Sequence, residues 1–147
     1  MAKIPEFLWE PMNTAYPAKV ALVGTSMPDG YAQVSPRGSI LIYDDETIAF
    51  WARGRGKTHE NLSDGDKVTI YFRDIDLRAS GALPKGGIAR FYGTATIHKE
   101  GPAYETVWER MIEQERTADP DKKGYAVLIA VERAEDLAHN PLEDWTP

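Results

Sequence analysis

The chain has 147 residues, 42% of them hydrophobic and 27% charged, which is the composition of one globular domain with its own hydrophobic core. Its formal net charge of −6 argues against a nucleic-acid partner, and the absence of cysteine excludes disulfides, thiol catalysis and cysteine metal sites. The N-terminal segment contains no long apolar run, so we expect a cytoplasmic protein with neither signal peptide nor membrane partner. No repeat or linker divides residues 1–147, which predicts a single domain.

The first third of the chain predicts a short helix followed by strands. Residues 5–14 carry apolar side chains between prolines and predict the helix. Residues 18–25 predict a strand that ends at a tight turn in residues 27–30, where Pro28 and Asp29-Gly30 occur. Residues 38–43 and 47–52 flank an acidic tripeptide and predict a hairpin.

Two later segments show the alternation of half-buried strands. Residues 67–73 place Val68, Ile70 and Phe72 on one face. Residues 88–98 repeat the pattern, with Gly93 predicting a bend or bulge.

One longer helix is expected over residues 103–116. Its apolar side chains recur at helical spacing and form one stripe, namely Tyr104, Val107, Trp108, Met111 and Ile112. Residues 111–123 are interpreted as the exposed end of this helix, with Asp119-Pro120 as its stop. Residues 124–133 predict a final strand. Strands that follow one another without regular β-α alternation favour an α+β fold, mainly antiparallel, with a dominant barrel of six to seven strands.

The stretch 52–62, ARGRGKTHENL, carries the clearest functional signal. Its Gly-Lys-Thr is not a nucleotide-binding P-loop, because Trp51 stands where the first glycine of that motif is required. Arg53, Arg55 and Lys57 instead precede a short helix expected from Thr58 to about Ser63. An anion there would be held by cations, backbone amides and the helix dipole. The alternative is a basic surface loop that binds nothing.

Arg37 is a second candidate. Residues 37–38 are interpreted as the start of a strand, where the arginine side chain could reach across to a ligand. The alternative is a hairpin-edge arginine that pairs with Asp44, Asp45 or Glu46. The histidines His59, His98 and His139 lack the spacing of helical metal pairs, so no metal is assigned.

Arg37, the returning strand TIAFWA, the Arg-x-Lys-Thr loop and the strands KVTIYFR and RFYGTATI together resemble the FMN-binding split-barrel family, the pyridoxamine 5'-phosphate oxidase-like superfamily. The resemblance covers about residues 18–131. It implies a homodimeric split β-barrel with two flavin sites at the subunit interface. It also implies that Arg55, Lys57 and Thr58 contact the phosphate of FMN, and that Arg37, Gly38 and Ser39 with Phe50, Trp51 and Ala52 flank the ring system.

The resemblance therefore implies a flavin-dependent oxidoreductase acting on a small molecule, with no catalytic residue assigned. Oxidases of pyridoxamine phosphate carry further C-terminal substrate contacts that this sequence does not show, so we expect a different substrate. Trp145 could cover the flavin of a partner subunit. The alternatives are an F420-dependent reductase of the same fold, a non-catalytic flavin or haem carrier or sensor, and an interaction domain without a ligand.

Overall fold

The structure is a computed structural model that describes residues 2–53 and 62–142. The described elements in chain order are η1 (Glu6–Leu8), α1 (Trp9–Asn13), β1 (Ala21–Ser26), β2 (Ala32–Arg37), β3 (Leu41–Asp44), β4 (Thr47–Ala52), β5 (Lys67–Arg73), α3 (Ile75–Ser80), β6 (Ile88–His98), α4 (Pro102–Arg110), α5 (Glu113–Thr117) and β7 (Tyr125–Asp136).

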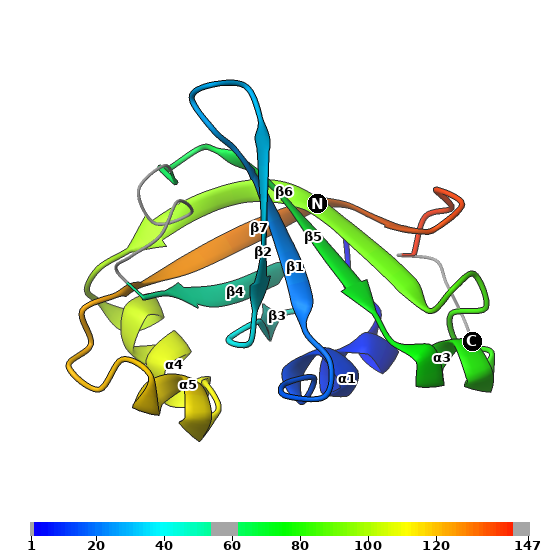
Figure 1. Cartoon of the computed structure of the whole chain (residues 1–147), viewed down its shortest axis with the longest axis horizontal. Coiled ribbons are helices and arrows are strands. Elements are labelled where there is room, and N and C mark those ends of the chain that lie inside the picture. The colour runs from blue at the N-terminus through cyan, green and yellow to red at the C-terminus, as the bar shows by residue number, and fades with distance from the viewer. Residues whose placement is uncertain (1, 54–61, 143–147) are drawn as a thin grey trace.

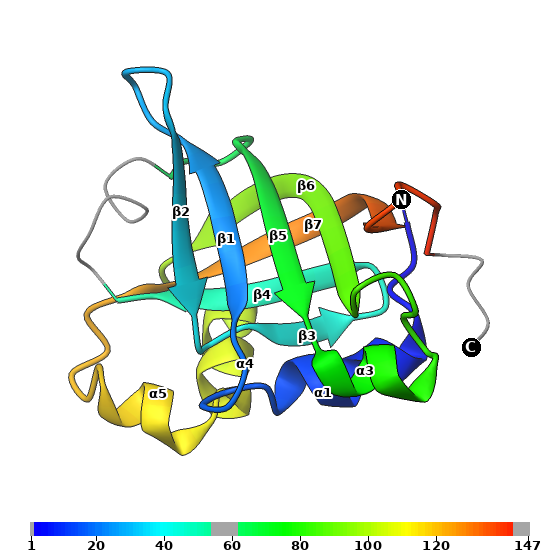
Figure 2. The ribbon, with the colours of Figure 1, turned by 45° about the vertical axis from the view of Figure 1, so that its right-hand side comes forward.

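The seven strands form one antiparallel sheet in the order β2-β1-β5-β6-β7-β4-β3. The sheet curls so that β2, β1 and β5 lie across β7, β4 and β3 (Figure 2). Its edge strands β2 and β3 do not pair with each other, so the barrel stays open. The expected α+β fold with a split, mainly antiparallel barrel is thereby confirmed.

The side chains that point into the barrel form the main core. Val68, Ile70 and Phe72 of β5 are at most 2% exposed, as the alternation of this strand predicts. Gly93 also behaves as expected, because the pairing of β6 with β7 shifts register between Tyr92 and Gly93. The bulge bends β6 and helps the sheet to curl.

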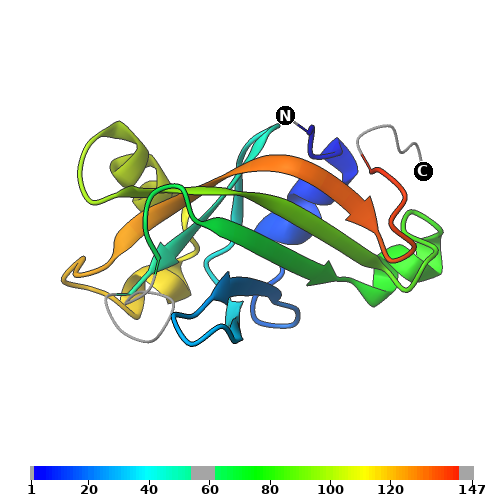
Figure 3. The same ribbon diagram turned by 90° about the horizontal axis from the view of Figure 1, so that it is seen from above.

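Helices pack on the parts of the curled sheet that other strands leave uncovered. The N-terminal helix α1 contributes Met12 to the core, and Leu8 beside it is fully buried. Helix α4 packs on β4 and β7. Helices α4 and α5 lie at one end of the molecule, and α3 lies at the other (Figures 1 and 3).

Strand β2 was missed by the sequence analysis. It pairs with β1 over residues 32–37, and Arg37 is its last residue rather than the start of the next strand. The pattern is hard to read because Pro36 lies within it and Val34 is 59% exposed. An edge strand tolerates both features, since one of its sides makes no hydrogen bonds to the sheet. The expected strand 38–43 is correspondingly shorter, beginning only at Leu41.

The expected single helix 103–116 is wrong. Met111 and Ile112 adopt extended backbone conformations, with ψ of 150° and 152°, and they separate α4 from α5. The guanidinium of Arg116 donates to the carbonyl groups of Glu109 and Met111, which the break leaves without helical partners. The break redirects the chain, and α5 turns away from α4.

Helix α3 (Ile75–Ser80) lies between β5 and β6. Asp74 caps this helix through the N–H of Asp76, and Gly81 ends it with φ of 85°. The short helix expected from Thr58 falls largely on residues 54–61, outside the described residues. None of the helices in the described ranges is long and apolar enough to cross a membrane.

We predict that Gly93→Ala lowers the free energy of unfolding by about 1–3 kcal/mol, the usual cost of overpacking a filled site. An added Cβ would collide with the carbonyl oxygen of Ala130 and lie 2.7 Å from Cγ2 of Ile129. Urea unfolding measures the change. Gly24→Ala is the matched control, because its nearest neighbour atom lies 3.7 Å away. Equal stability of the two variants would contradict the close packing at the bulge.

Candidate functional site

The candidate site is built where β4 ends. Strand β4 is buried on both faces, because Ile48, Phe50 and Ala52 enter the barrel core while Ala49 and Trp51 pack in a second cluster with α4. The hydroxyl of Ser39 accepts from the N–H of Trp51 at 3.0 Å and donates to its carbonyl at 3.3 Å. These bonds tie the turn after β2 to the end of β4.

Asp119 fixes the indole of Trp51 in place. Its carboxylate accepts from Nε1 of Trp51 at 2.8 Å and from the backbone N–H groups of Lys123 and Gly124. Burial alone would raise the pKa of Asp119, but these hydrogen bonds lower it below the ordinary value. The Trp51 ring also packs in tilted arrangements against Tyr104 and Trp108 of α4, with centroids 5.2 and 5.1 Å away.

A hollow of about 200 Å³ opens beside this anchored strand end. Its charged side chains are two arginines and one glutamate. The lining residues are Pro36, Arg37, Gly38, Ser39, Trp51, Arg53 and Glu115. The hollow therefore joins the ends of β2 and β4 to helix α5.

Arg37 is held at this hollow by an aromatic ring. Its guanidinium carbon lies 5.4 Å from the centre of the Phe50 ring. Burial and the nearby charge of Arg53 lower the pKa of Arg37, while Glu115 opposes the shift. The Nε atom of Arg37 is buried and has no hydrogen-bond partner among the described residues. A buried donor of this kind favours an acceptor from a ligand.

Glu115 of α5 supplies the carboxylate. Its side chain is only 4% exposed and forms an ion pair with Arg53. A Cβ at position 38 would collide with Oε1 of Glu115 and lie 2.6 Å from the ring of Tyr16. A larger residue at position 38 would therefore force the side chains of Glu115 and Tyr16 to move.

A second, larger hollow has a volume of about 620 Å³, and its lining includes residues that directly follow segment 54–61 in the sequence. It is lined by Leu62, Ser63, Asp64, Ile97, His98, Lys99, Glu100 and Tyr125. Burial raises the pKa of Tyr125, against the effect of the Arg37 charge, and Lys99 lies over its ring at 5.5 Å. Tyr125 thus lies near Arg37 and also lines this second hollow.

The structure brings together Arg37, Gly38, Ser39 and Trp51, four of the residues predicted to bind a cofactor. The side chains of Phe50 and Ala52 are fully buried in the core, and the Trp51 ring is 1% exposed. Arg55, Lys57 and Thr58 lie outside the described residues, as does Trp145. Their assignment to a cofactor stays a prediction.

The alternative role of Arg37 as a hairpin-edge ion pair is not what the structure shows. Arg37 lies over Phe50, whereas Asp45 and Glu46 pair with Lys3 at 2.8 and 2.9 Å.

Glu115 was missed by the sequence analysis, which interpreted residues 111–123 as an exposed helix end. Glu115 and Asp119 are 4% and 6% exposed. Charge and helical spacing give no signal for this burial, because it arises from the break before α5. Arg53 was recognised only as one of three local cations, and its partner could not be known from the sequence.

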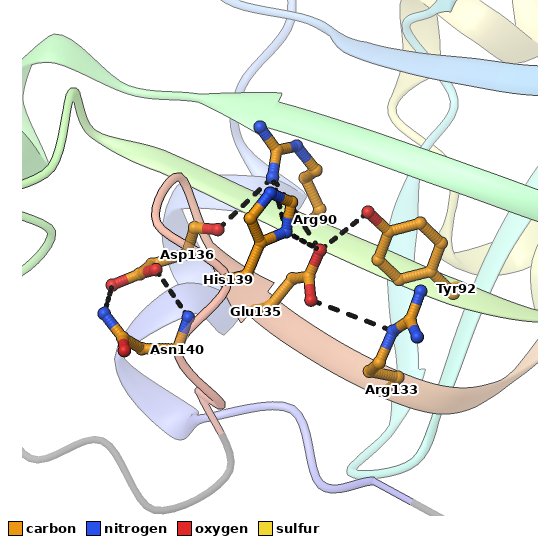
Figure 4. A network of polar contacts seen from close by, with 7 residues as sticks. All are labelled: Arg90, Tyr92, Arg133, Glu135, Asp136, His139 and Asn140. Carbon is orange, nitrogen blue, oxygen red and sulfur yellow. Dashed lines mark hydrogen bonds and ion pairs between the residues drawn. The ribbon is translucent and has the colours of Figure 1, made fainter.

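A separate polar network joins β6, β7 and the C-terminal turn (Figure 4). Glu135 accepts from the hydroxyl of Tyr92 at 2.7 Å, and its Oε1 lies 2.8 Å from Nδ1 of His139. Arg90 and Arg133 lie within 3.8 Å of the same carboxylate. Burial would raise the pKa of Glu135, but Tyr92, His139 and Arg133 lower it below the ordinary value. We interpret this network as a structural clamp on the turn.

His139 therefore serves the clamp, and across the described ranges no cluster of three or more histidine, aspartate or glutamate side chains is arranged to hold a metal ion.

The sequence is related to a known protein family. The model of the pyridoxamine 5'-phosphate oxidase family matches residues 13–138. The chain belongs to this family. No curated protein matches the sequence significantly.

Several solved structures share the fold. HupZ of Group A Streptococcus is 28% identical with a TM-score of 0.70, and the match covers 94% of this chain and 97% of HupZ. An F420 reductase is 15% identical with a TM-score of 0.59, covering 90% and 98% of the two chains. An FMN-binding protein from Syntrophomonas wolfei is 14% identical with a TM-score of 0.54, covering 87% and 84%. The last two similarities concern the fold alone.

We predict that Asp119→Asn destabilises the protein by about 1–3 kcal/mol at neutral pH, because buried donors lose a charged acceptor. The lowered pKa of Asp119 means that its contribution is present above the ordinary value of 3.8 and is lost as the pH falls through the folded-state pKa. The difference between variant and wild type should therefore shrink below that value.

Chemical unfolding followed by tryptophan fluorescence between neutral and acidic pH measures this difference. Asp121→Asn, at an exposed position two residues away, is the control and should leave stability unchanged. A constant difference across the whole pH range would contradict the charged role of Asp119.

Proposed function

We propose that this protein is an FMN-binding oxidoreductase that transfers hydride or electrons to or from a small molecule. The observation that carries the proposal is the convergence of Arg37 and Arg53 on a hollow at the end of β4. The chain continues from Arg53 into the segment that contains Arg55, Lys57 and Thr58. Family membership and the FMN-binding neighbour of the same fold support the choice of flavin.

The residues present suit an anionic ligand. Guanidinium groups recognise phosphate and carboxylate oxygens, and the buried Nε of Arg37 has a free donor within the described structure. Bound FMN would supply the redox chemistry, while this chain would bind and orient it and exclude water. Arg55, Lys57 and Thr58 would hold its phosphate.

We further propose that the protein acts as a homodimer with cofactor sites at the interface. Strand β2 is an edge strand whose outward face exposes Val34, and an apolar hollow of about 490 Å³ extends from it over β1 and β5. A second copy is the occupant that suits this face, because two-fold pairing buries the same apolar patch on both subunits at once.

An F420-dependent reductase is the second candidate, favoured by the F420 reductase that shares the fold. Mass spectrometry of the ligand that co-purifies separates the two. Titration of the ligand-free protein with FMN and then F420 ranks them directly. A haem carrier would show the absorption spectrum of haem. A flavin carrier would bind tightly without reduction by NAD(P)H.

We predict that Lys57→Ala weakens FMN binding by about 1–3 kcal/mol, through loss of a charge-assisted hydrogen bond to phosphate. Riboflavin, which lacks the phosphate, should bind both proteins equally. Calorimetric titration measures both affinities. Lys85→Ala removes an exposed lysine of the loop before β6 and serves as the control. Unchanged FMN affinity in Lys57→Ala would remove the phosphate assignment.

We predict that Val34→Asp shifts the protein from dimer to monomer, because a charge on β2 would be buried without a partner at the interface. Light scattering after size-exclusion chromatography measures the molecular mass. Ile75→Asp changes a side chain that is 49% exposed on α3 and should leave the mass unchanged. A Val34→Asp protein that keeps the dimer mass would place the interface elsewhere.

A further inference from the structure

Glu115 stands where an anionic ligand group would be expected to bind. Its carboxylate lies in the hollow with Arg37 and Arg53, and it is the acidic member of the lining. It pairs with Arg53 and packs on Gly38. A buried carboxylate from the protein itself therefore already uses one of the two guanidinium groups.

Arg37 has no carboxylate at ion-pair distance among the described residues, because Glu115 pairs with Arg53. The charge of Arg53 also acts on the nearby carboxylate of Asp119. The buried Nε of Arg37 lacks a hydrogen-bond partner in the described ranges. The guanidinium lies over the face of the Phe50 ring, which offers no hydrogen-bond acceptor of comparable strength. The hollow thus has the charge and the donor for one further oxyanion.

Helix α5, which carries Glu115, is short and is separated from α4 by a break. It has five residues and begins after the extended residues Met111 and Ile112. Its first backbone bonds run from Glu115 and Arg116 to the carbonyl of Ile112, at 3.1 and 3.2 Å. A change of backbone angles at residues 111–112 could move α5 without unfolding α4, since two extended residues interrupt the helical hydrogen bonds.

We propose that Glu115 is an internal competitor for an oxyanion subsite formed by Arg37 and Arg53, and that a phosphate or carboxylate group displaces it by moving α5. The subsite belongs to the proposed cofactor site, so this inference rests on that function for the identity of the ligand. The competition itself depends only on the three charged side chains. Glu115 is then a specificity residue, because it admits to Arg53 only ligands that carry an oxyanion.

The test compares Glu115→Gln with Glu113→Gln. Glutamine keeps the shape of the side chain and removes its charge, and Glu113 is an exposed residue of the same helix. We expect inorganic phosphate and acetate to bind Glu115→Gln roughly fivefold more tightly than wild type, which is the value of a partly exposed ion pair. The Glu113→Gln protein should match wild type. Calorimetry at constant ionic strength measures these affinities.

FMN and riboflavin identify the source of the oxyanion. Tighter binding of FMN but not of riboflavin by Glu115→Gln assigns the subsite to the cofactor phosphate. Unchanged binding of both flavins, with tighter acetate or phosphate, assigns it to a substrate group. The proposal would be overturned if Glu115→Gln bound FMN and riboflavin more tightly by the same factor. It would also be overturned if Glu115→Gln bound no anion more tightly than wild type does.

A measurement on the wild-type protein covers the case in which Glu115→Gln does not fold. Hydrogen exchange at the amides of Glu115 and Arg116 should accelerate when inorganic phosphate replaces chloride, because displacement loosens α5. Unchanged exchange at saturating phosphate would count against the inference. If Lys57→Ala leaves FMN binding intact while Glu115→Gln still tightens phosphate, the proposed cofactor assignment fails and the subsite stands.

Discussion

The burial of strand β4 on both faces is the constraint on which the rest of the structure depends. Phe50 packs into the barrel, and Trp51 packs outward against α4. Both side chains are buried and closely packed, so the end of the strand is held in place. Arg53 therefore leaves the strand at a defined position beside Gly38. The bonds of Ser39 and Asp119 to Trp51 reinforce this position. A rigid strand end is what a binding site needs, since small displacements of charged groups change affinity.

Two kinds of charged cluster can be distinguished in the described structure. Asp119 and the Glu135 network are saturated by hydrogen bonds, and their lowered pKa values keep them ionised. These two groups stabilise the fold. The group of Arg37, Arg53 and Glu115 is different, because the buried Nε of Arg37 has no hydrogen-bond partner in the described structure. A buried donor without a partner costs stability unless a ligand supplies the acceptor, which is why it marks a candidate site.

Local patterns predicted most of the strands correctly, and the failures share one cause. Strand β5 alternates strictly and β6 alternates over its central part, because one face of each strand is buried in the barrel. The sequence pattern and the environment of these strands therefore agree. Edge strand β2 exposes Val34 and contains Pro36, so its sequence does not show the alternation that marks a strand with one face in the core. The break at residues 111–112 lies inside an apolar stripe that suits a continuous helix. Its origin is the packing of α5, which involves residues distant in the sequence.

The sequence by itself determined the fold class, the family and the cluster of cations after β4, because alternation, composition and short motifs depend on neighbouring residues. Only the tertiary structure decided which of these residues share one hollow. It placed Arg37 at the end of β2, turned the Trp51 ring away into the α4 cluster and brought Glu115 onto Arg53. Residues 53 and 115 meet because two chain segments fold onto each other, and such long-range contacts leave no periodic signal in either segment.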